Sequence, residues 1–297
     1  MTMDKNFSDS ISKVTGSTQV YAIIGWPVAH SLSPVMQNAA FSACGINAIY
    51  VPFPVREGQL SEAVSGLRAL NICGCNVTVP HKEKIAPYLD CLAPEAEAIG
   101  AVNTVVCKNS VLEGHNTDAD GFLHSLDFDL GFTPGQKRIF VLGAGGAARA
   151  CVYALARAGA SQIWVANRNA KRAEGMCSDF ASLFPATAMS ACGLGSDLFN
   201  TATGEADLIV NTTSIGLHDR ADDPLVWENI DSKTLFYDVV YKSGMSTHMV
   251  AQAHKHGLRA ADGLGMLIAQ GEQSFRLWTG EDPGAAMRQV LAARTLR

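Results

Sequence analysis

The stretch Ile139–Ala150 reads IFVLGAGGAARA, and the fold of the chain can be worked out from it in both directions. Four apolar residues run directly into a glycine cluster, and an alanine-rich run of helix formers follows. This is the order of a buried parallel strand, a tight turn and the N-terminus of a helix. Gly143, Gly145 and Ala148 fill the G-x-G-x-x-G/A pattern of dinucleotide-binding turns.

The small residues of this turn have a physical role in such sites. The first glycine permits the turn, the second lets the backbone approach a pyrophosphate, and the third small residue lets the helix pack closely on the strand. Backbone N–H groups and the positive end of the helix dipole then face the phosphates. A purely structural turn is the alternative at this stage. The candidate phosphate-binding residues are Gly143, Ala144, Gly145, Gly146 and Ala147.

The residues after the next predicted strand, 163–166, bear on the kind of nucleotide. In an NAD site an acidic residue about 20 positions after the first glycine binds the ribose 2′-hydroxyl. Here Asn167 and Arg168 follow the strand, Lys171 and Arg172 come close behind, and the first acidic residue is Glu174. A guanidinium binds a 2′-phosphate well, so the sequence favours NADP(H), with NAD as the weaker alternative. The ordinary alternative is that these cations form a solvated helix face.

Alternating strands and helices occur in both parts of the chain, which predicts two α/β domains. We expect an N-terminal α/β substrate domain with a mainly parallel sheet, and a Rossmann-like NADP-binding domain. In the first domain, strands are predicted at 20–24, 48–52 and 75–79, with helices at 33–44 and 59–70. In the second, strands are predicted at 139–142, 163–166, 208–210 and 235–240, with an edge strand at 259–261, helices at 170–183 and 246–255, and a loop at 193–203.

The predicted domain boundaries follow from these patterns. Residues 1–18 are polar and are expected to form a flexible extension. The substrate domain is expected to comprise 19–118 together with 264–297, and the NADP-binding domain 119–263. The final helices, at about 265–278 and 284–293, belong to no strand–helix pair and are expected to pack back onto the first domain.

Composition excludes several classes of partner. Of the 297 residues, 47% are hydrophobic and 17% charged, as in a globular protein with a large core. The net charge of −5, without a basic stripe, makes nucleic acid an unexpected partner. No apolar run approaches ~20 residues, so no membrane span is predicted. The eight cysteines lack metal-ligand spacing, so we expect no metal and a reducing, cytoplasmic location. An edge strand could support a homodimer, which leaves monomer and homodimer open.

Polar residues gather near the ends of the predicted strands of the first domain, where open α/β sheets bind ligands. Each has an ordinary explanation when taken alone: Ser33 as a helix N-cap, Lys82 as a surface lysine, Asn103 as a turn residue, Asp118 as another N-cap. Together they suggest a hydroxyl-rich pocket for a small polyhydroxylated acid. The candidates are Ser31, Ser33, Thr78, Lys82, Asn103 and Asp118.

Nine motifs, in order along the chain, resemble those of the shikimate dehydrogenase family. They are Gly25–Pro34 (GWPVAHSLSP), Asn76–Lys82 (NVTVPHK), Gly100–Thr104 (GAVNT), Asn116–Asp118 (NTD), Gly143–Ala147 (GAGGA), Asn167–Arg168 (NR), Asn211–Gly216 (NTTSIG), Asp238–Tyr241 (DVVY) and Asp262–Leu267 (DGLGML). The resemblance runs from about Tyr21 to the final helices.

The resemblance implies a role for each matching residue. Lys82 would be the acid/base residue and Asp118 its partner, in the cleft between the domains. The substrate-binding residues would be Ser31, Ser33, Thr78, Asn103, Asp118, Tyr241 and Gln270. The cofactor site would comprise the glycine turn with Asn167, Arg168, Lys171, Arg172, Thr212, Ser214, Val239 and Gly263, the last two on the nicotinamide side.

The implied reaction is the reversible, NADP-dependent reduction of 3-dehydroshikimate to shikimate in chorismate and aromatic amino acid biosynthesis. An ammonium group at Lys82 would stabilise the charge that hydride transfer builds on the carbonyl oxygen, and would donate the proton. Some residues depart from the family pattern: Trp26, Ala119, Asn169 and the segment 242–248. Ser31–Asn38 and Leu277–Gly280 resemble the quinate/shikimate branch, which uses NAD and NADP less strictly. A quinate-active enzyme and a non-catalytic dinucleotide sensor therefore stay as alternatives.

Overall fold

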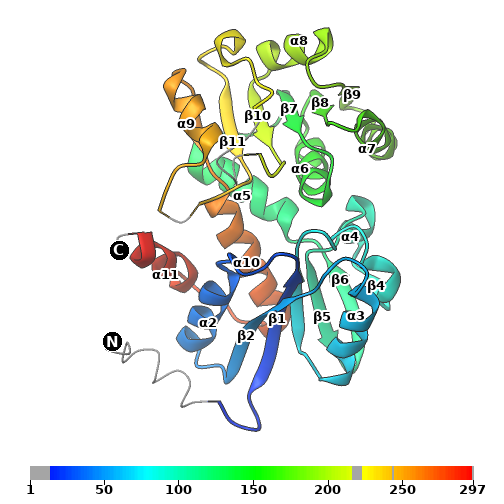
Figure 1. Ribbon diagram of the computed structural model, residues 1–297, viewed down its shortest axis with the longest axis vertical. Helices are drawn as coiled ribbons and strands as arrows, with labels where there is room; N and C mark the ends of the chain where they lie inside the picture. The colour runs from blue at the N-terminus through cyan, green and yellow to red at the C-terminus, as the bar shows by residue number, and fades with distance from the viewer. Residues whose placement is uncertain (1–13, 216–222, 243, 296–297) are drawn as a thin grey trace. The chain divides into compact units, whose positions relative to one another are not determined.

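The computed structural model describes residues 14–215, 223–242 and 244–295 (Figure 1). It divides into two compact units: one contains the chain up to Thr117 and again from Gly271, and the other contains Asp118–Gln270. We call them unit 1 and unit 2. The predicted domains divide the chain after residues 118 and 263, whereas the units divide it after 117 and 270. Most of the predicted N-terminal extension, residues 1–13, lies outside the described residues.

Unit 1 is built on a six-stranded sheet with the strand order β2-β1-β3-β5-β6-β4. β1 runs parallel to both β2 and β3, whereas β5 pairs antiparallel with β3 and β6, and β4 runs parallel to β6. The strands are β1 (Gln19–Gly25), β2 (Ala48–Pro54), β3 (Gly74–Val77), β4 (Cys91–Leu92), β5 (Thr104–Lys108) and β6 (Val111–His115).

The sequence patterns did not predict β4 or β6. β4 has two residues, and β6 (VLEGH) contains a glycine and two polar residues, so neither carries a clear strand signal. The β5–β6 pair is a hairpin whose turn residues, Asn109 and Ser110, have φ values of 52° and 65°. Two consecutive residues with positive φ fit the type I′ geometry that suits the twist of a hairpin.

The helices of unit 1 are α2 (Ser33–Ala43), α3 (Leu60–Ala69), α4 (Pro94–Ile99), α11 (Ala286–Thr295), the part of α10 (Leu264–Thr279) from Gly271 onward, and the 3-10 turn η1 (Ala86–Tyr88). Aromatic side chains pack α10 against α2 and β1. Phe275 and Trp278 of α10 lie 5.2 Å, centroid to centroid, from the rings of Phe41 and Tyr21 respectively. α11 packs on α2. The prediction that the C-terminal helices return to the first domain is confirmed.

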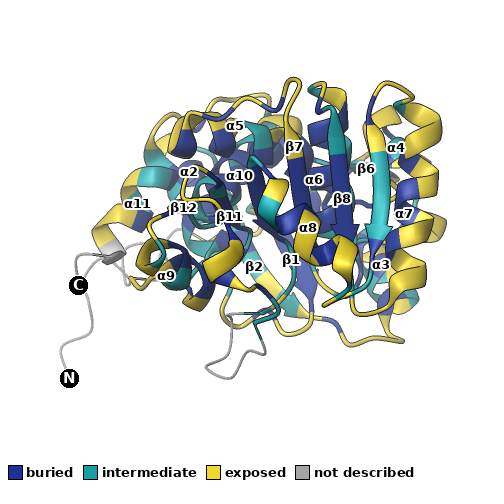
Figure 2. Cartoon of the chain, turned by 90° about the horizontal axis from the view of Figure 1, so that it is seen from above, coloured by how far each residue is buried: buried dark blue, intermediate teal, exposed yellow. Residues whose placement is uncertain are grey.

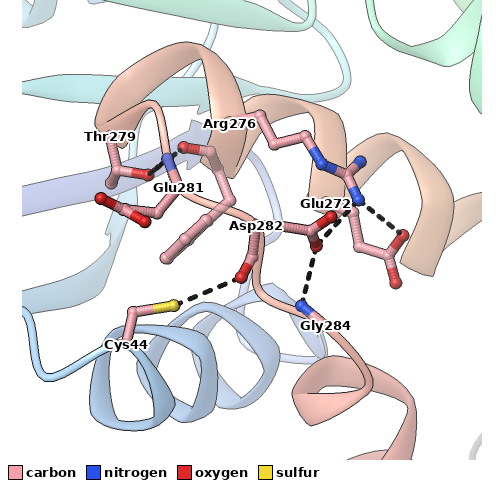
Figure 3. Close-up of polar contacts among 8 residues, drawn as sticks. Cys44, Glu272, Arg276, Thr279, Glu281, Asp282 and Gly284 are labelled. Atoms are coloured by element: carbon pink, nitrogen blue, oxygen red, sulfur yellow. Dashed lines mark hydrogen bonds and ion pairs between the residues drawn. The ribbon is translucent and has the colours of Figure 1, made fainter.

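The turn between α10 and α11 is held by polar contacts (Figure 3). Asp282 Oδ1 accepts from Gly284 N at 2.8 Å and from Arg276 Nη2 at 3.1 Å. The thiol of Cys44, after α2, donates to the backbone carbonyl of Asp282 at 3.6 Å. Hydrogen bonding to two donors lowers the pKa of the Asp282 carboxyl. These contacts fix the point at which the chain turns back across α2.

One local prediction about α2 is wrong. Ser33 was expected to be the N-cap, but Leu32 occupies that position without a side-chain cap, and Ser33 and Pro34 are the first two helical residues. Ser33 N instead donates to Ser31 Oγ at 3.2 Å, so the hydroxyl of Ser31 satisfies an N–H group that has no partner within the helix.

Unit 2 is built on a six-stranded, fully parallel sheet. Its order, β12-β11-β10-β7-β8-β9, is the 3-2-1-4-5-6 order of dinucleotide-binding folds, counted from β7. Figure 2 shows β7 and β8 almost wholly in the colour of buried residues, as expected when helices cover both faces. The strands are β7 (Arg138–Leu142), β8 (Gln162–Ala166), β9 (Ala188–Cys192), β10 (Leu208–Asn211), β11 (Leu235–Asp238) and β12 (Arg259–Ala261). The predicted fold class, including the edge strand at 259–261, is confirmed.

The helices of unit 2 are α5 (Asp118–Leu130), α6 (Gly146–Arg157), α7 (Ala170–Leu183), α8 (Asp197–Glu205), α9 (His248–Lys255) and α10 up to Gln270, with the 3-10 turn η2 (Trp227–Asn229). The prediction of a loop over 193–203 is wrong, because α8 begins there. Ser196 caps the helix by accepting from Phe199 N, and the fully buried ring of Phe199 packs edge-on against Phe140. Tertiary burial thus stabilises a helix whose Asn, Thr and Gly residues give little intrinsic helix propensity.

Candidate active site

The glycine turn joins β7 to α6 as predicted. Gly143 has φ +118°, and Gly145 is the N-cap of the twelve-residue helix α6. A Cβ atom at Gly143 would overlap Thr212 Oγ1, so the turn needs glycine for both conformation and space. Ala148 is fully buried where helix and strand meet. These features fit a pyrophosphate, because a turn of glycine and alanine residues precedes a helix N-terminus.

The loop after β10 packs directly against this turn. Thr212 donates from both N and Oγ1 to Leu142 O, each at 2.8 Å. Three hydrogen bonds hold Thr213 and Ile215 in place. Thr213 N and Oγ1 donate to Asn211 Oδ1, and Ile215 N donates to Thr213 Oγ1. Ser214 is exposed in this loop. The predicted cofactor residues Gly143 and Thr212 therefore lie together at the carboxyl ends of β7 and β10.

The cations after β8 lie on the surface. Arg168, Lys171 and Arg172 are all exposed, and Asn167 Nδ2 donates to Asn169 O at 3.0 Å across the start of α7. Asn169 is the N-cap of that helix. Three cationic side chains at the carboxyl end of β8, beside the glycine turn on β7, suit a phosphate group on the ribose.

Val239 and Gly263 also come together. Gly263 N donates to Val240 O at 3.1 Å, and a Cβ at Gly263 would overlap the carbonyl of Val239. Val239 N donates to Asn211 O at 2.8 Å, which joins this pair to the loop after β10. The backbone thus approaches closely here because residue 263 lacks a side chain.

A buried carboxylate lies behind these loops. Asp238 Oδ1 accepts from Asn211 Nδ2 at 2.8 Å and from Val240 N at 3.1 Å, and Asp238 Oδ2 accepts from Thr247 Oγ1 at 2.6 Å. Burial raises the pKa of Asp238 to about 6, although its three hydrogen bonds act in the opposite direction. Burial also raises the pKa of Asp262, beyond β12, and of Tyr237.

The other three predicted residues of unit 2 occupy separate elements. Tyr241 is half-buried, three residues beyond the end of β11. Gln270 is buried on α10, and its Nε2 donates to Leu267 O at 2.7 Å. Asp118 is the first residue of α5 and is buried.

In unit 1 the predicted residues gather at the ends of β1 and β3. Thr78 N donates to Ile24 O at 2.9 Å, and Gly25 leaves room for the Thr78 side chain. Lys82 is half-buried, and its carbonyl accepts from Val102 N at 2.8 Å, next to Asn103. Ser31 lies in the loop after β1, where its N donates to Val28 O at 3.1 Å.

Asn103 belongs to a buried polar network that the sequence analysis did not find. Its Oδ1 accepts from Thr117 N at 2.8 Å, and its Nδ2 donates to Thr117 Oγ1 at 2.9 Å. Behind it lie Asn76, Thr104 and Ser274, all buried and hydrogen-bonded to one another. The only signal in the sequence was polar residues at positions 76 and 104 within otherwise apolar strands.

Within residues 14–215, 223–242 and 244–295, no three His, Cys, Asp or Glu side chains are grouped so that they could bind a metal. In the same ranges, every helix is too short or too polar to cross a membrane.

The fold and the residues at the strand ends define the class of protein. A parallel sheet in the dinucleotide-binding order, a glycine turn at a helix N-terminus, cations at the end of the next strand and a separate hydroxyl-rich α/β unit are typical of a two-domain NADP-dependent oxidoreductase.

Sequence and structure comparisons identify the family within this class. Residues 23–105 match the shikimate dehydrogenase substrate binding domain, 130–231 match shikimate / quinate 5-dehydrogenase, and 263–292 match the shikimate 5′-dehydrogenase C-terminal domain. The chain is 49% identical over 282 residues to shikimate dehydrogenase (NADP+) of Geobacter metallireducens, covering 94% of this chain and 98% of that one. The chain therefore belongs to the shikimate dehydrogenase family.

Solved structures agree with this assignment. The crystal structure of a shikimate dehydrogenase in complex with NADP+ has a TM-score of 0.85 at 34% identity, and the match covers 96% of this chain and 98% of that one. Shikimate 5-dehydrogenase of Thermus thermophilus, in complex with NADP(H) and shikimate, has a TM-score of 0.81 at 35% identity, with 93% and 100% covered.

Proposed function

We propose that this protein is an NADP-dependent shikimate dehydrogenase that catalyses the reversible reduction of 3-dehydroshikimate to shikimate. The observation that carries the proposal is the arrangement of unit 2, where the glycine turn and Thr212 loop lie beside a strand that ends in exposed cations. The family match extends across both units, which supports a complete enzyme rather than a nucleotide-binding module alone.

The roles of the individual residues are part of the proposal. The backbone of residues 143–147, with Thr212 and Ser214, binds the pyrophosphate region, and Asn167, Arg168, Lys171 and Arg172 bind the adenosine 2′-phosphate. Val239 and Gly263 contact the nicotinamide side. Bound NADPH supplies the hydride. Backbone N–H groups suit phosphate oxygens, and guanidinium groups suit a dianionic phosphate.

The substrate roles fall mainly on unit 1. Ser31, Ser33, Thr78 and Asn103, with Asp118, Tyr241 and Gln270, bind the carboxylate and hydroxyl groups. Lys82 donates a proton to the carbonyl oxygen as negative charge develops there, and takes it back in the oxidation direction. Asp118 is the proposed partner of Lys82 in acid/base catalysis and binds a substrate hydroxyl.

The wider setting is also proposed. The substrate is a small molecule, and neither nucleic acid nor a membrane is an expected partner at a net charge of −5. We place the enzyme in the cytoplasm, as a monomer or homodimer, in chorismate and aromatic amino acid biosynthesis.

A steady-state assay of shikimate and quinate, each with NADP+ and NAD+, tests the proposal. We expect the highest kcat/KM with shikimate and NADP+. Comparable values for quinate and NAD+ would instead support a quinate/shikimate dehydrogenase. Tight NADPH binding without turnover of either acid would support a non-catalytic sensor.

The structure weakens one argument for the quinate alternative. The segment Leu277–Gly280 resembles the quinate branch, but its Trp278 is a core residue. Trp278 Nε1 donates to Val105 O at 3.0 Å, and the ring fills the space that Gly74 leaves. The position of Trp278 is therefore accounted for by its packing on the sheet.

A further inference from the structure

An asparagine that binds a substrate has two possible amide orientations, which differ in what they offer a hydroxyl group. One presents the N–H groups as donors, and the other presents the carbonyl oxygen as an acceptor. Asn103 is 2% exposed, so the interior of unit 1, rather than solvent, decides its orientation.

The inner contacts of Asn103 define this orientation. The backbone N–H of Thr117 can only donate, and it lies 2.8 Å from Asn103 Oδ1. Thr104 Oγ1 donates to the same oxygen at 3.1 Å. Asn103 Nδ2 in turn donates to Thr117 Oγ1 at 2.9 Å. The opposite amide orientation would place an NH₂ group against the N–H donor of Thr117, and the Thr104 hydroxyl would have to turn its proton away from residue 103.

A second layer of residues fixes the hydroxyl of Thr104. With its proton directed to Asn103 Oδ1, the Thr104 oxygen can accept hydrogen bonds from the rest of the network. Asn76 Nδ2 donates to Thr104 Oγ1 at 3.1 Å and to Ser274 Oγ at 3.0 Å, and Ser274 Oγ lies 2.8 Å from Thr104 Oγ1. Tyr50 Oη donates to Asn76 Oδ1 at 2.7 Å, which fixes the second amide.

The network is buried, and the five side chains that form it around Asn103 are all neutral. Thr104 and Ser274 have no exposed surface, and Asn76 and Thr117 are 5% and 3% exposed. Hydrogen bonds in such surroundings are strong and costly to break, so the loss of one hydroxyl group should disturb the hydrogen bonds of its neighbours. Ser274 is the contribution of α10, and it lies 3.2 Å from Thr117 Oγ1 as well.

We propose that Thr104 and Ser274 are positioning residues for substrate binding: they hold the Asn103 amide so that its nitrogen side, rather than its oxygen, serves as the hydrogen-bonding group for a substrate hydroxyl. The proposal rests on the proposed function for its ligand, shikimate. It assigns to helix α10 a part in substrate selection through Ser274, a residue that does not itself contact the substrate.

The first test uses variants that remove a hydroxyl with little change in volume. Thr104→Val and Ser274→Ala should each raise KM for shikimate roughly three- to tenfold, with KM for NADP+ within about twofold of the wild-type value. Thr104→Ser keeps the hydroxyl and should restore KM for shikimate. Thr203→Val is the matched control in unit 2, because Thr203 is buried and donates only to helix carbonyls at 3.1 Å.

An unchanged KM for shikimate in both Thr104→Val and Ser274→Ala would overturn the proposal. So would a KM increase that Thr104→Ser fails to reverse, or equal increases for shikimate and NADP+, since either points to general structural damage. Thermal unfolding of each variant identifies such damage directly.

A second test does not depend on turnover. In ¹⁵N-labelled wild-type protein the side-chain NH₂ of Asn103 should give one pair of slowly exchanging signals. These should broaden or exchange faster in Thr104→Val and Ser274→Ala, and not in Thr104→Ser. If these signals behave as expected while shikimate is neither bound nor oxidised, the proposed function fails and the positioning role stands. If the signals do not change, the positioning role fails whatever the substrate.

Discussion

Units 1 and 2 support their loops in chemically different ways. In unit 1 the polar residues behind the ends of β3 and β5 are amides and hydroxyls: Asn76, Asn103, Thr104, Thr117 and Ser274. In unit 2 one carboxylate, Asp238, accepts from Asn211, Val240 N and Thr247, and so connects the loops after β10 and β11 with the start of α9.

Because of this difference, we expect the neutral network of unit 1 and the buried carboxylate of unit 2 to respond differently to pH. A neutral network keeps the same hydrogen bonds across the physiological pH range. A buried carboxylate makes stronger, charge-assisted bonds, but it loses hydration and can take up a proton. We therefore expect unit 1 to be sensitive to the loss of single hydroxyl groups, and unit 2 to be sensitive to pH as well.

The largest effect is expected at Lys82, a charged side chain in unit 1 that is not one of the neutral residues of the Asn103 network. Lys82→Ala should lower kcat by at least ~10³-fold, because it removes the proposed proton donor, while KM for shikimate changes little. Lys84→Ala is the matched control: that lysine is more exposed and pairs with Glu57. A near-normal kcat in Lys82→Ala would remove Lys82 from the proposed role.

Asp238→Asn tests the charged arrangement of unit 2. The folded-state pKa of about 6 lies above the ordinary 3.8, so the folded state binds this proton more tightly than the unfolded state does. Stability contributed by Asp238 is therefore full at low pH and is lost as pH rises from about 4 to 6. The free energy of unfolding of the variant, relative to wild type, should rise by up to ~3 kcal/mol between pH 4 and pH 7.

Denaturant unfolding of the variant and of wild type at several pH values measures this change. A loss of hydrogen bonds that does not depend on pH shifts all the values equally and does not affect the change. Thr104→Val, in the neutral network, should show the same change in unfolding free energy at pH 4 and pH 7. The free energy of unfolding of Asp238→Asn minus that of wild type should rise with pH. If this difference stays constant or falls with pH, the raised pKa of Asp238 is contradicted.

Arg168→Ala is expected to have a smaller effect, on cofactor choice. It should raise KM for NADPH about ten- to thirtyfold, since one charge-assisted phosphate contact is lost, and leave KM for NADH nearly unchanged. Arg138→Ala serves as control, because Arg138 begins β7 at the amino edge of the sheet and pairs with Glu205 at 3.1 Å. Equal effects on both cofactors would argue against the 2′-phosphate contact.

The smallest effect is expected at Gln37, on α2. Among the buried side-chain atoms of the described residues, Gln37 Oε1 alone has no hydrogen-bond partner. Gln37→Leu removes that oxygen together with one bond, from Nε2 to Gly271 O at 2.9 Å, so the free energy of unfolding should change by less than ~1 kcal/mol.

Asn76→Leu provides the contrast, because it removes a partner that Tyr50, Thr104 and Ser274 share. It should lower the free energy of unfolding by more than ~2 kcal/mol. Equal losses in Gln37→Leu and Asn76→Leu would show that the neutral network has no special stability.

Local sequence patterns predicted much of the fold. The apolar run before Gly143 and the alternation after it were enough to predict the dinucleotide-binding sheet, and the cations after β8 were enough to favour NADP. The same patterns missed α8 and β6, since a short element with weak propensity forms only when partners bury it. They also predicted Ser33 to be the N-cap of α2, whereas it is the first helical residue. A serine before a proline fits both the N-cap position and the first helical turn.

By itself, the sequence determined the kinds of residue available, the order of strands and helices, and the position of the glycine turn, because these depend on local periodicity and on the conformational freedom of single residues. Only the tertiary structure decided which polar side chains meet. Ser274 hydrogen-bonds Asn76 across 198 positions in the chain, and Asp238 bonds Asn211 across 27. Such contacts form because packing brings distant strands and helices together, and no local pattern records which buried donor will face which acceptor.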